Sequence, residues 1–445
     1  MMPEDIAMKE NPLINIVRKQ KEGNAVGIYS CCSANRYVLE AAIACGLRDK
    51  APVLIESTAN QCDQYGGYTG MTPHDFREFV LDICHEYCFD EKLLYLGGDH
   101  LGPLTFAHLN EEEAMKEAAE LVRCYVAAGF TKIHLDTSMK LADDDPDAGL
   151  SDEKIAIRGA YLARVAEETY QHEVLAKDPE AIPPVYVVGS EVPIPGGSTD
   201  NGELEVTRVE DFEKTYAIFE KTFRDNGLEE AWGRVIAFVV QPGVEEKDEG
   251  CTEYDRDKAR ALCSALDDHP NIVFEGHSTD YQTRIKLREM VEDGIAILKV
   301  GPGLTFAMRE GLLALSFIEA TMLKDKGVPL SHFAVVLEEE MLKNSRYWKK
   351  HYQGDRADLK LKRMYSFSDR CRYYMPTEEV SSAINTLMHN LRTYGIPLNL
   401  LSQFMPAQYV KVREGILVND PHVLVIDHIM EMIGNYLYAT KQNEL

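Results

Sequence analysis

Short apolar runs and longer amphipathic stretches alternate along the chain from Ala25 to about Leu323. Runs rich in β-branched residues and bounded by polar or glycine-containing turns predict strands, and apolar residues that recur every three or four positions predict helices between them. Eight strand–helix units over about 300 residues are typical of a closed (β/α)8 TIM barrel. An open, doubly wound sheet is the alternative, because strand order cannot be read from one sequence. We expect strands at Ala25–Tyr29, Pro52–Glu56, Leu93–Gly97, Lys132–Asp136, Val185–Gly189, Val235–Val240, Asn271–Phe274 and Ile297–Val300.

The alternation stops after Leu323, which divides the chain into two regions. We expect a barrel over residues 1–325 and a mainly helical C-terminal region over residues 326–445. Basic and aromatic residues gather between Arg346 and Tyr374, in a segment that either binds a phosphate or a partner subunit, or is a solvated connector packed on the barrel. Amphipathic spacing predicts helices at Ser331–Lys343, Glu378–Tyr394 and Val423–Leu437.

Composition and charge exclude several classes of protein. Of the 445 residues, 45% are hydrophobic and 27% charged, which is typical of a globular protein with a large core. The net charge of −26 argues against a general surface for nucleic acid or anionic lipid. No apolar run has the about 20 residues of a membrane-spanning helix, and the N-terminal residues do not form a signal peptide. We therefore expect a cytoplasmic protein whose ten cysteines are reduced.

Polar side chains follow the predicted strands at their carboxyl ends, where barrel enzymes carry their reactive groups. Asp99 and His100 follow the third strand, and Glu275 and His277 follow the seventh with a spacing that lets both face one side. Imidazoles and carboxylates at one barrel mouth suit a divalent ion such as Zn²⁺, Co²⁺ or Mn²⁺. The alternative is that both histidines are structural. We expect His100 and His277 to hold the ion with one or more of Glu191, Glu275 and Gln241.

Two neighbouring residues receive separate interpretations. Asp99 lies directly before a predicted metal ligand, so we expect it to act as a general acid or base. His134 lies two residues before Asp136 and can face the same mouth, but we interpret it as a hydrogen-bonded core histidine.

The segment Lys299–Gly303 ends the eighth strand and opens a helix. Free backbone N–H groups and the helix dipole at such a junction form a cradle for phosphate, although ordinary turn chemistry explains the glycines equally well. No GxGxxG follows a strand and no GxxxxGK[ST] is present, which argues against nicotinamide cofactors and P-loop nucleotides. The residues expected to bind a phosphorylated substrate are Gln61, Ser278, Thr279, Lys299, Gly301, Gly303 and, from the C-terminal region, Arg370.

Segments spread over the whole chain carry a resemblance to a known family. Together they resemble the Z-subunit family of tagatose-1,6-bisphosphate aldolase and, more distantly, the class II metal-dependent ketose-bisphosphate aldolase barrels. The segments are Ile55–Pro73, Gly97–Pro103, Lys132–Ser138, Glu191–Gly197, Val239–Val244, Gly276–Thr283, Leu298–Phe306, Ser368–Arg370 and Leu401–Pro406.

The resemblance to the class II aldolases implies catalytic roles for individual residues. Asp99 and His100 match the catalytic aspartate and the zinc-binding histidine that follows it. Asp136 matches the aspartate of the fourth-strand motif, and Glu191 matches the glutamate at the end of the fifth strand. The resemblance therefore implies that Asp99, Asp136 and Glu191 take part in catalysis.

The other two zinc-ligand positions of the class II aldolases differ in this sequence. Gln241 stands where those enzymes have a histidine after the sixth strand. Glu275 stands at the seventh-strand ligand position, and His277 follows two residues later. The resemblance therefore implies a metal site with an altered ligand set, in which His277 takes a shifted role.

Family membership implies a place in galactitol, N-acetylgalactosamine or tagatose catabolism, with two functions open. Z subunits are described as non-catalytic partners that stabilise a Y-type aldolase subunit, whereas some relatives are described as fructose-6-phosphate 4-epimerases. Inversion at C4 of a 2-ketose cannot use simple enolisation, because C4 is not adjacent to the carbonyl. Cleavage and re-formation of C3–C4 with a divalent metal (Zn, Mn, Ni, Co or Mg) is the economical route. We expect this epimerase as a homo-oligomer, with the accessory subunit as the alternative.

Overall fold

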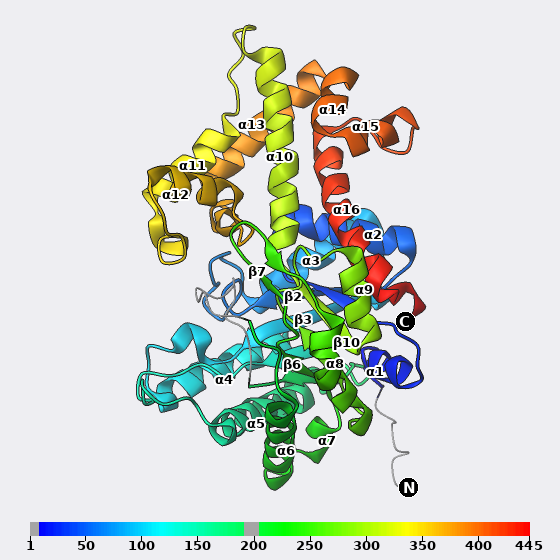
Figure 1. Cartoon of the computed structure of the whole chain (residues 1–445), viewed down its shortest axis with the longest axis vertical. Coiled ribbons are helices and arrows are strands. Elements are labelled where there is room, and N and C mark those ends of the chain that lie inside the picture. The colour runs from blue at the N-terminus through cyan, green and yellow to red at the C-terminus, as the bar shows by residue number, and fades with distance from the viewer. Residues whose placement is uncertain (1–8, 191–203) are drawn as a thin grey trace.

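The computed structural model describes residues 9–190 and 204–445. Its centre is a closed barrel of eight parallel strands in the order β1-β10-β9-β6-β5-β4-β3-β2, which confirms the TIM barrel and excludes the open sheet (Figure 1). A short hairpin of β7 (Glu245–Glu246) and β8 (Cys251–Thr252) lies outside the barrel. The barrel strands are β1 (Ile28–Cys31), β2 (Val53–Thr58), β3 (Leu94–Leu101), β4 (Lys132–Leu135), β5 (Val185–Val188), β6 (Val235–Val240), β9 (Val273–Gly276) and β10 (Ile295–Val300).

All eight predicted strands are present, with shifts of a few residues at their ends. The strand predicted at Leu93–Gly97 continues to Leu101, so Asp99 and His100 belong to β3 rather than to the loop after it. Pairing between β3 and β4 shifts register after Gly98, and His100 has a φ of 52°. The left-handed conformation is uncommon for a non-glycine residue and is frequent at functional sites, so the end of β3 is locally distorted where its polar side chains begin.

Amphipathic helices form the outer layer, as the apolar spacing predicts (Figure 1). Side-chain caps start several of them; for example, Asn110 Oδ1 accepts a hydrogen bond from the Glu113 backbone N–H at the start of α4. The helices that follow the strands are α2 (Arg36–Asp49), α3 (Pro73–Tyr87), α4 (Glu111–Ala127), α5 (Asp152–Thr169), α6 (Val209–Asp225), α7 (Glu229–Trp232), α8 (Arg256–Ala265), α9 (Arg284–Glu292) and α10 (Pro302–Leu323).

The two ends of the barrel interior differ in polarity. Helix α1 (Ile14–Lys21) packs under the amino-terminal end, where Ile16 and Val17 join the apolar side chains of the strands. Burial of this layer removes apolar surface from water and leaves the carboxyl end for polar residues. The buried side chains of the apolar layer include Leu13, Ile28, Leu54, Val185, Val187, Ile236, Val239, Val273 and Ile297.

The C-terminal region is helical, as predicted, and its helices pack around the long helix α10 (Figure 1). Its last helix, α16, runs back to the barrel and packs against α10, α2 and α9. The division at residue 325 stays a prediction, because α16 shares the outer layer with barrel helices. The helices are α11 (Phe333–Lys343), α12 (Arg356–Tyr365), α13 (Glu378–Tyr394), α14 (Leu398–Phe404), α15 (Pro406–Arg413) and α16 (Pro421–Thr440). Within the described residues, every helix is too short or too polar to span a membrane.

Candidate active site

Inward-facing side chains near the carboxyl ends of the strands form one buried group, the charged cluster. Alternate residues of a strand share a face, so β4 and the residue after it direct Lys132, His134 and Asp136 to the same side. Each residue of the charged cluster is at most 5% exposed. The charged cluster consists of Glu56, Asp99, His100, Lys132, His134, Asp136, Glu275, His277 and Lys299.

Two lysines and three carboxylates form ion pairs within the charged cluster. Lys132 Nζ lies 2.7 Å from Glu56 Oε1 and 2.7 Å from Glu275 Oε2. Lys299 Nζ contacts Glu56 and lies 2.9 Å from Asp99 Oδ1. Burial acts to lower the pKa of Lys299, but Asp99 and the other neighbouring anions raise it well above its usual value. Lys299 is therefore an ammonium ion held against carboxylates.

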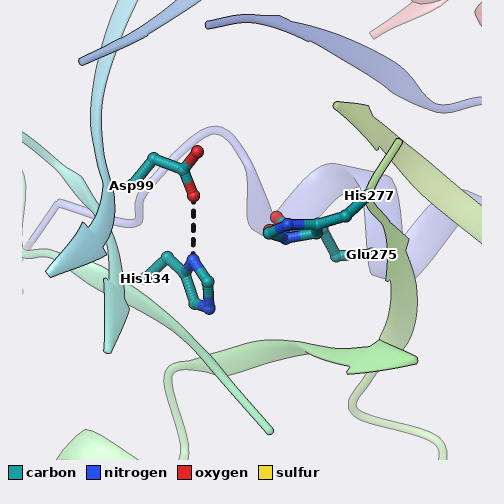
Figure 2. Close-up of side chains that lie close together, drawn as sticks. All are labelled: Asp99, His134, Glu275 and His277. Atoms are coloured by element: carbon teal, nitrogen blue, oxygen red, sulfur yellow. Dashed lines mark hydrogen bonds and ion pairs between the residues drawn. The ribbon is translucent and has the colours of Figure 1, made fainter. Parts of the chain in front are cut away.

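Three imidazole rings meet in the charged cluster. The ring centroids of His100 and His134 are 5.0 Å apart, those of His100 and His277 are 5.0 Å apart, and those of His134 and His277 are 5.2 Å apart. Each ring also contacts a carboxylate: His134 Nδ1 lies 2.9 Å from Asp99 Oδ1, and His277 Nε2 lies 2.9 Å from Glu275 Oε1 (Figure 2). His100 Nδ1 lies 2.8 Å from Asp136 Oδ2.

The surroundings of the rings shift their protonation in opposite directions. Burial lowers the pKa of His277 to about 4, although Glu275 acts to raise it. The pKa of His100 is raised, because Asp99 and Asp136 outweigh the effect of burial. Burial acts to raise the pKa of Asp99, but His100, Lys299 and its other neighbours hold it well below the usual range. At neutral pH, His277 is thus a neutral imidazole and Asp99 a carboxylate.

The donor set of the charged cluster fits a divalent metal ion. Three imidazoles that bind one tetrahedral ion at about 2.0–2.1 Å through nitrogen have ring centres about 5 Å apart, close to the observed spacings. His134 Nε2 is buried and accepts or donates no hydrogen bond within the described part of the chain. One ligand atom from each of four side chains lies within 4.8 Å of the others, and these side chains, drawn in Figure 2, are Asp99, His134, Glu275 and His277.

Charge balance points the same way. Four carboxylates of the charged cluster face two lysines, so a net negative charge remains even when His100, whose pKa is raised, carries a proton. Uncompensated charge in a buried site is costly, and a divalent cation would neutralise it. The residues present therefore fit the metal that the sequence predicts.

The structure brings together some predicted ligands and not others. His100 and His277 lie side by side, as a shared site requires, and Glu275 contacts His277. Gln241 is turned into its own loop, where its Oε1 accepts hydrogen bonds from the backbone N–H groups of Gly243 and Val244 at 2.8 and 3.0 Å. A residue on another strand, His134, lies among the side chains that could hold a metal ion instead. Glu191 lies outside the described residues.

A solvent-open cavity lies above the charged cluster. Asp99, His100, His277 and Lys299 line it, which makes these side chains accessible to a small molecule. Further lining residues include the predicted substrate ligands Gln61, Ser278 and Gly301, together with Asn60, Tyr68, Glu246, Asp280, Arg372 and Tyr373. The cavity therefore combines reactive groups with polar side chains that suit a hydroxylated substrate.

The predicted phosphate cradle already holds a carboxylate of the chain. Asp280 Oδ1 accepts hydrogen bonds from the backbone N–H groups of Gly301 at 3.0 Å and Gly303 at 2.7 Å. Thr279 Oγ1 donates to the Lys299 carbonyl at 2.6 Å, which joins two neighbouring loops of the barrel. Gly303 and Thr279 thus support the wall of the cavity. The N–H groups of Gly301 and Gly303 bind the Asp280 carboxyl group rather than a phosphate.

The basic and aromatic segment reaches the cavity through Arg372 rather than through the predicted Arg370. Arg370 is buried, and its Nη1 donates to the Tyr347 carbonyl at 3.3 Å. Arg372 lines the cavity, while its Nη1 donates to the Ser368 and Asp369 carbonyls. Arginines two positions apart in a tight helical turn point to different sides, and sequence alone does not tell which one faces the barrel.

His134 is the functional candidate that the sequence led us to interpret as core, and of the two arginines Arg370 and Arg372 the sequence led us to choose Arg370. The alternation of Lys132, His134 and Asp136 was a usable signal, because three polar residues at inward positions of one strand are unusual in an apolar barrel. For Arg372, the only signal was its place in a basic and aromatic segment.

Comparison with known proteins gives the family. The family model described as D-tagatose-1,6-bisphosphate aldolase subunit GatZ/KbaZ-like matches residues 13–441. The chain is similar to the crystal structure of a probable tagatose 6 phosphate kinase from Sinorhizobium meliloti 1021, with 42% identity and a TM-score of 0.84 over 93% of this chain and 100% of that chain.

Two aldolase structures resemble the chain more weakly. A fructose-bisphosphate aldolase from Campylobacter jejuni has 13% identity and a TM-score of 0.42 over 85% of this chain and 91% of that chain. The YdjI aldolase from Escherichia coli K12 has 10% identity and a TM-score of 0.39 over 87% of this chain and 98% of that chain. On the family model and the Sinorhizobium relative, the chain belongs to the GatZ/KbaZ-like family of D-tagatose-1,6-bisphosphate aldolase subunits.

Proposed function

We propose that the chain is itself a catalyst, a metal-dependent ketose-phosphate 4-epimerase that interconverts fructose 6-phosphate and tagatose 6-phosphate. The observation that carries the proposal is the group of three imidazoles with Asp99 and Lys299 at the floor of an accessible cavity. A subunit that only stabilises a partner gains nothing from these groups, because burying charged and polar side chains costs stability. Selection for catalysis explains why the chain retains them.

The residues that would hold the metal are His134, His277 and Glu275, with His100 and the carboxylate of Asp99 beside them. When bound, such an ion supplies Lewis-acid polarisation of the ketose oxygens. The neutral state of His277 suits this role, since a neutral imidazole has one ring nitrogen with a free lone pair for a metal ion.

Epimerisation at C4 by this route needs one base and one stabiliser of negative charge. Asp99 takes the proton of the C4 hydroxyl, the C3–C4 bond breaks, and its electron pair forms the C2–C3 double bond of an enediolate while C4 becomes an aldehyde carbon. Lys299 lies 2.9 Å from Asp99 and lines the cavity, so its ammonium group stabilises the developing oxyanion.

Re-addition completes the inversion. The aldehyde turns its other face to C3, the C3–C4 bond forms again, and the new C4 oxygen recovers the proton from Asp99. Atoms and electrons balance without an oxidant or a nucleotide. Arg372 lines the same cavity, and we assign the single phosphate of the substrate to its guanidinium group.

The proposal is tested with the purified single chain. Incubation with fructose 6-phosphate and Zn²⁺, Mn²⁺, Ni²⁺, Co²⁺ or Mg²⁺ should yield tagatose 6-phosphate. The conversion of one sugar phosphate into the other is followed by ¹³C NMR. The Asp99→Asn chain is the control for contaminating enzymes. Absence of turnover with every metal, together with activation of a Y-type aldolase subunit by this chain, would overturn the proposal and establish the accessory role.

A further inference from the structure

Two buried acids face the cavity beside the charged cluster. Asp280 lies on the loop after β9, three residues beyond His277, and its Oδ1 accepts hydrogen bonds from the backbone N–H groups of Gly301 and Gly303. Glu246 in strand β7 is 5% exposed and lines the same cavity. A small molecule in the cavity would therefore contact both acids.

Glu246 has a buried oxygen in need of a partner. Its Oε2 is shielded from solvent and has no hydrogen-bond partner in the part of the chain that the structure describes. A buried carboxyl oxygen without a partner costs free energy, so a donor from a ligand is favoured there. A sugar hydroxyl is such a donor, and a phosphate dianion is not.

The cations along the cavity wall are few. Among the described residues that line it, the lysines and arginines are Lys299 and Arg372. Lys299 already pairs with Glu56 and Asp99. One guanidinium group is thus left for a phosphate, and the backbone N–H groups that would serve a second one are taken by Asp280.

We propose that Glu246 and Asp280 are specificity residues that bind the C1 hydroxyl end of a ketose 6-phosphate and exclude the ketose 1,6-bisphosphate. This inference rests on the proposed function, because it takes the charged cluster as the place where C2 to C4 react. C1 is bonded to C2, so its substituent must lie next to the cluster. The loop residues that follow His277 and Lys299, which include Asp280 and Gly301, form that neighbouring wall.

Protonation of the pair agrees with hydroxyl binding. Burial and the charge of Glu246 raise the pKa of Asp280 to about 7. Burial also raises the pKa of Glu246. Both shifts favour a protonated carboxyl in the pair, and a carboxyl beside a carboxylate can both donate to and accept from a hydroxyl group. A C1 phosphate would bring further negative charge to two acids and find its cradle occupied.

The test is a binding measurement that does not depend on turnover. Calorimetry on the full chain, with and without Zn²⁺, compares fructose 6-phosphate, fructose 1-phosphate and fructose 1,6-bisphosphate. The wild type should bind fructose 6-phosphate at least tenfold more tightly than either sugar with a C1 phosphate. Glu246→Gln should narrow this affinity ratio at least tenfold, because it removes a negative charge from the cavity wall. Asp280→Ala combined with Glu246→Gln should narrow it at least as much, because the double variant also frees the Gly301 and Gly303 N–H groups.

Asp293→Asn is the matched control, since Asp293 accepts hydrogen bonds from Tyr254 and Arg256 outside the cavity and should leave the ratio unchanged. Should the Asp280 variant not fold, Glu246→Gln alone decides. Equal binding of the mono- and bisphosphate by the wild type, binding of neither, or an unchanged ratio in Glu246→Gln would overturn the inference. If the chain binds fructose 6-phosphate more tightly than the sugars with a C1 phosphate but epimerises none of them, the result would count against the proposed function. Glu246 and Asp280 would then still select the sugar phosphate that binds.

Discussion

His134 Nδ1 lies 2.9 Å from Asp99 Oδ1, across the distorted pairing of β3 and β4 (Figure 2). This contact joins the residue that sequence reasoning treated as core to the residue expected to transfer the proton. It makes His134 part of the candidate metal site and positions the Asp99 carboxylate.

Replacing His134 by Ala should weaken binding of Zn²⁺ at least about 100-fold, because it removes one of the three imidazoles. The measurement is metal competition against a chromogenic chelator on protein freed of metal. His85→Ala removes an exposed imidazole that pairs with Glu91 on the outer layer and should bind Zn²⁺ like the wild type. Unchanged affinity in His134→Ala would place the metal elsewhere.

Replacing Asp99 by Asn keeps the size of the side chain and removes the titratable group. Turnover of fructose 6-phosphate should fall by about 10²–10⁴, the usual contribution of a general acid or base. Binding of Zn²⁺ and the melting temperature show whether the loss is catalytic. If a well-folded, metal-loaded Asp99→Asn chain turned over at the wild-type rate, the proton would have to be handled by another group.

Replacing Arg372 by Ala should raise the KM for fructose 6-phosphate much more than the KM for unphosphorylated fructose, because the guanidinium group faces the cavity. Arg370→Ala is the internal comparison. It should change both KM values alike and lower the melting temperature, since Arg370 is buried and donates to the Tyr347 carbonyl. The reverse pattern would restore Arg370 as the phosphate ligand.

Replacing Lys132 by Met should destabilise the fold by about 3–5 kcal/mol, because Glu56 and Glu275 would lose the cation between them. Urea unfolding of metal-free protein measures the change. Lys221→Met breaks an exposed pair with Asp225 and should have no measurable effect. A loss below 1 kcal/mol in Lys132→Met would mean that the two glutamates carry protons in the folded state.

Asp280 should make stability depend on pH. Its pKa is raised to about 7 in the folded chain by burial and by Glu246, against about 3.9 when unfolded. Between these values the folded chain holds a proton that the unfolded chain has released, so stability is lost as pH rises from 4 to 7. The melting temperature of the wild type minus that of Asp280→Asn should therefore fall over this range and level off above it. A flat difference would contradict the shifted pKa.

Much of the fold could be predicted because barrel strands are short apolar runs with polar ends. The same rule located Asp99, His100 and His277, which follow or end strands. His134 was missed because its ring meets His277 from a strand that is not adjacent in the sheet. The closure of the barrel decides which inward side chains meet. Periodicity along one strand contains no information on the distance between side chains of two strands that are not neighbours.

The phosphate cradle shows a second limit of the sequence. Gly301 and Gly303 indicate free backbone N–H groups, and their geometry is as expected. The pattern cannot show that a carboxylate from another loop, Asp280, fills the space. Contacts between loops that follow different strands determine which group the N–H donors of the turn bind. The local sequence determines only the shape of the turn.

The end of the chain is hydrogen-bonded to the segments that lead into the first two strands of the barrel. The Gly27 backbone N–H donates to the Thr440 carbonyl at 2.8 Å, and Gln442 Nε2 donates to the Pro52 carbonyl at 2.7 Å, next to the first two strands. Contacts between residues about 400 positions apart form late and slow folding. Strands β1 and β2 leave the ribosome early yet stay incomplete until residue 442 has been synthesised. A nascent chain stalled before α16 should therefore expose its first strands to chaperones and proteases.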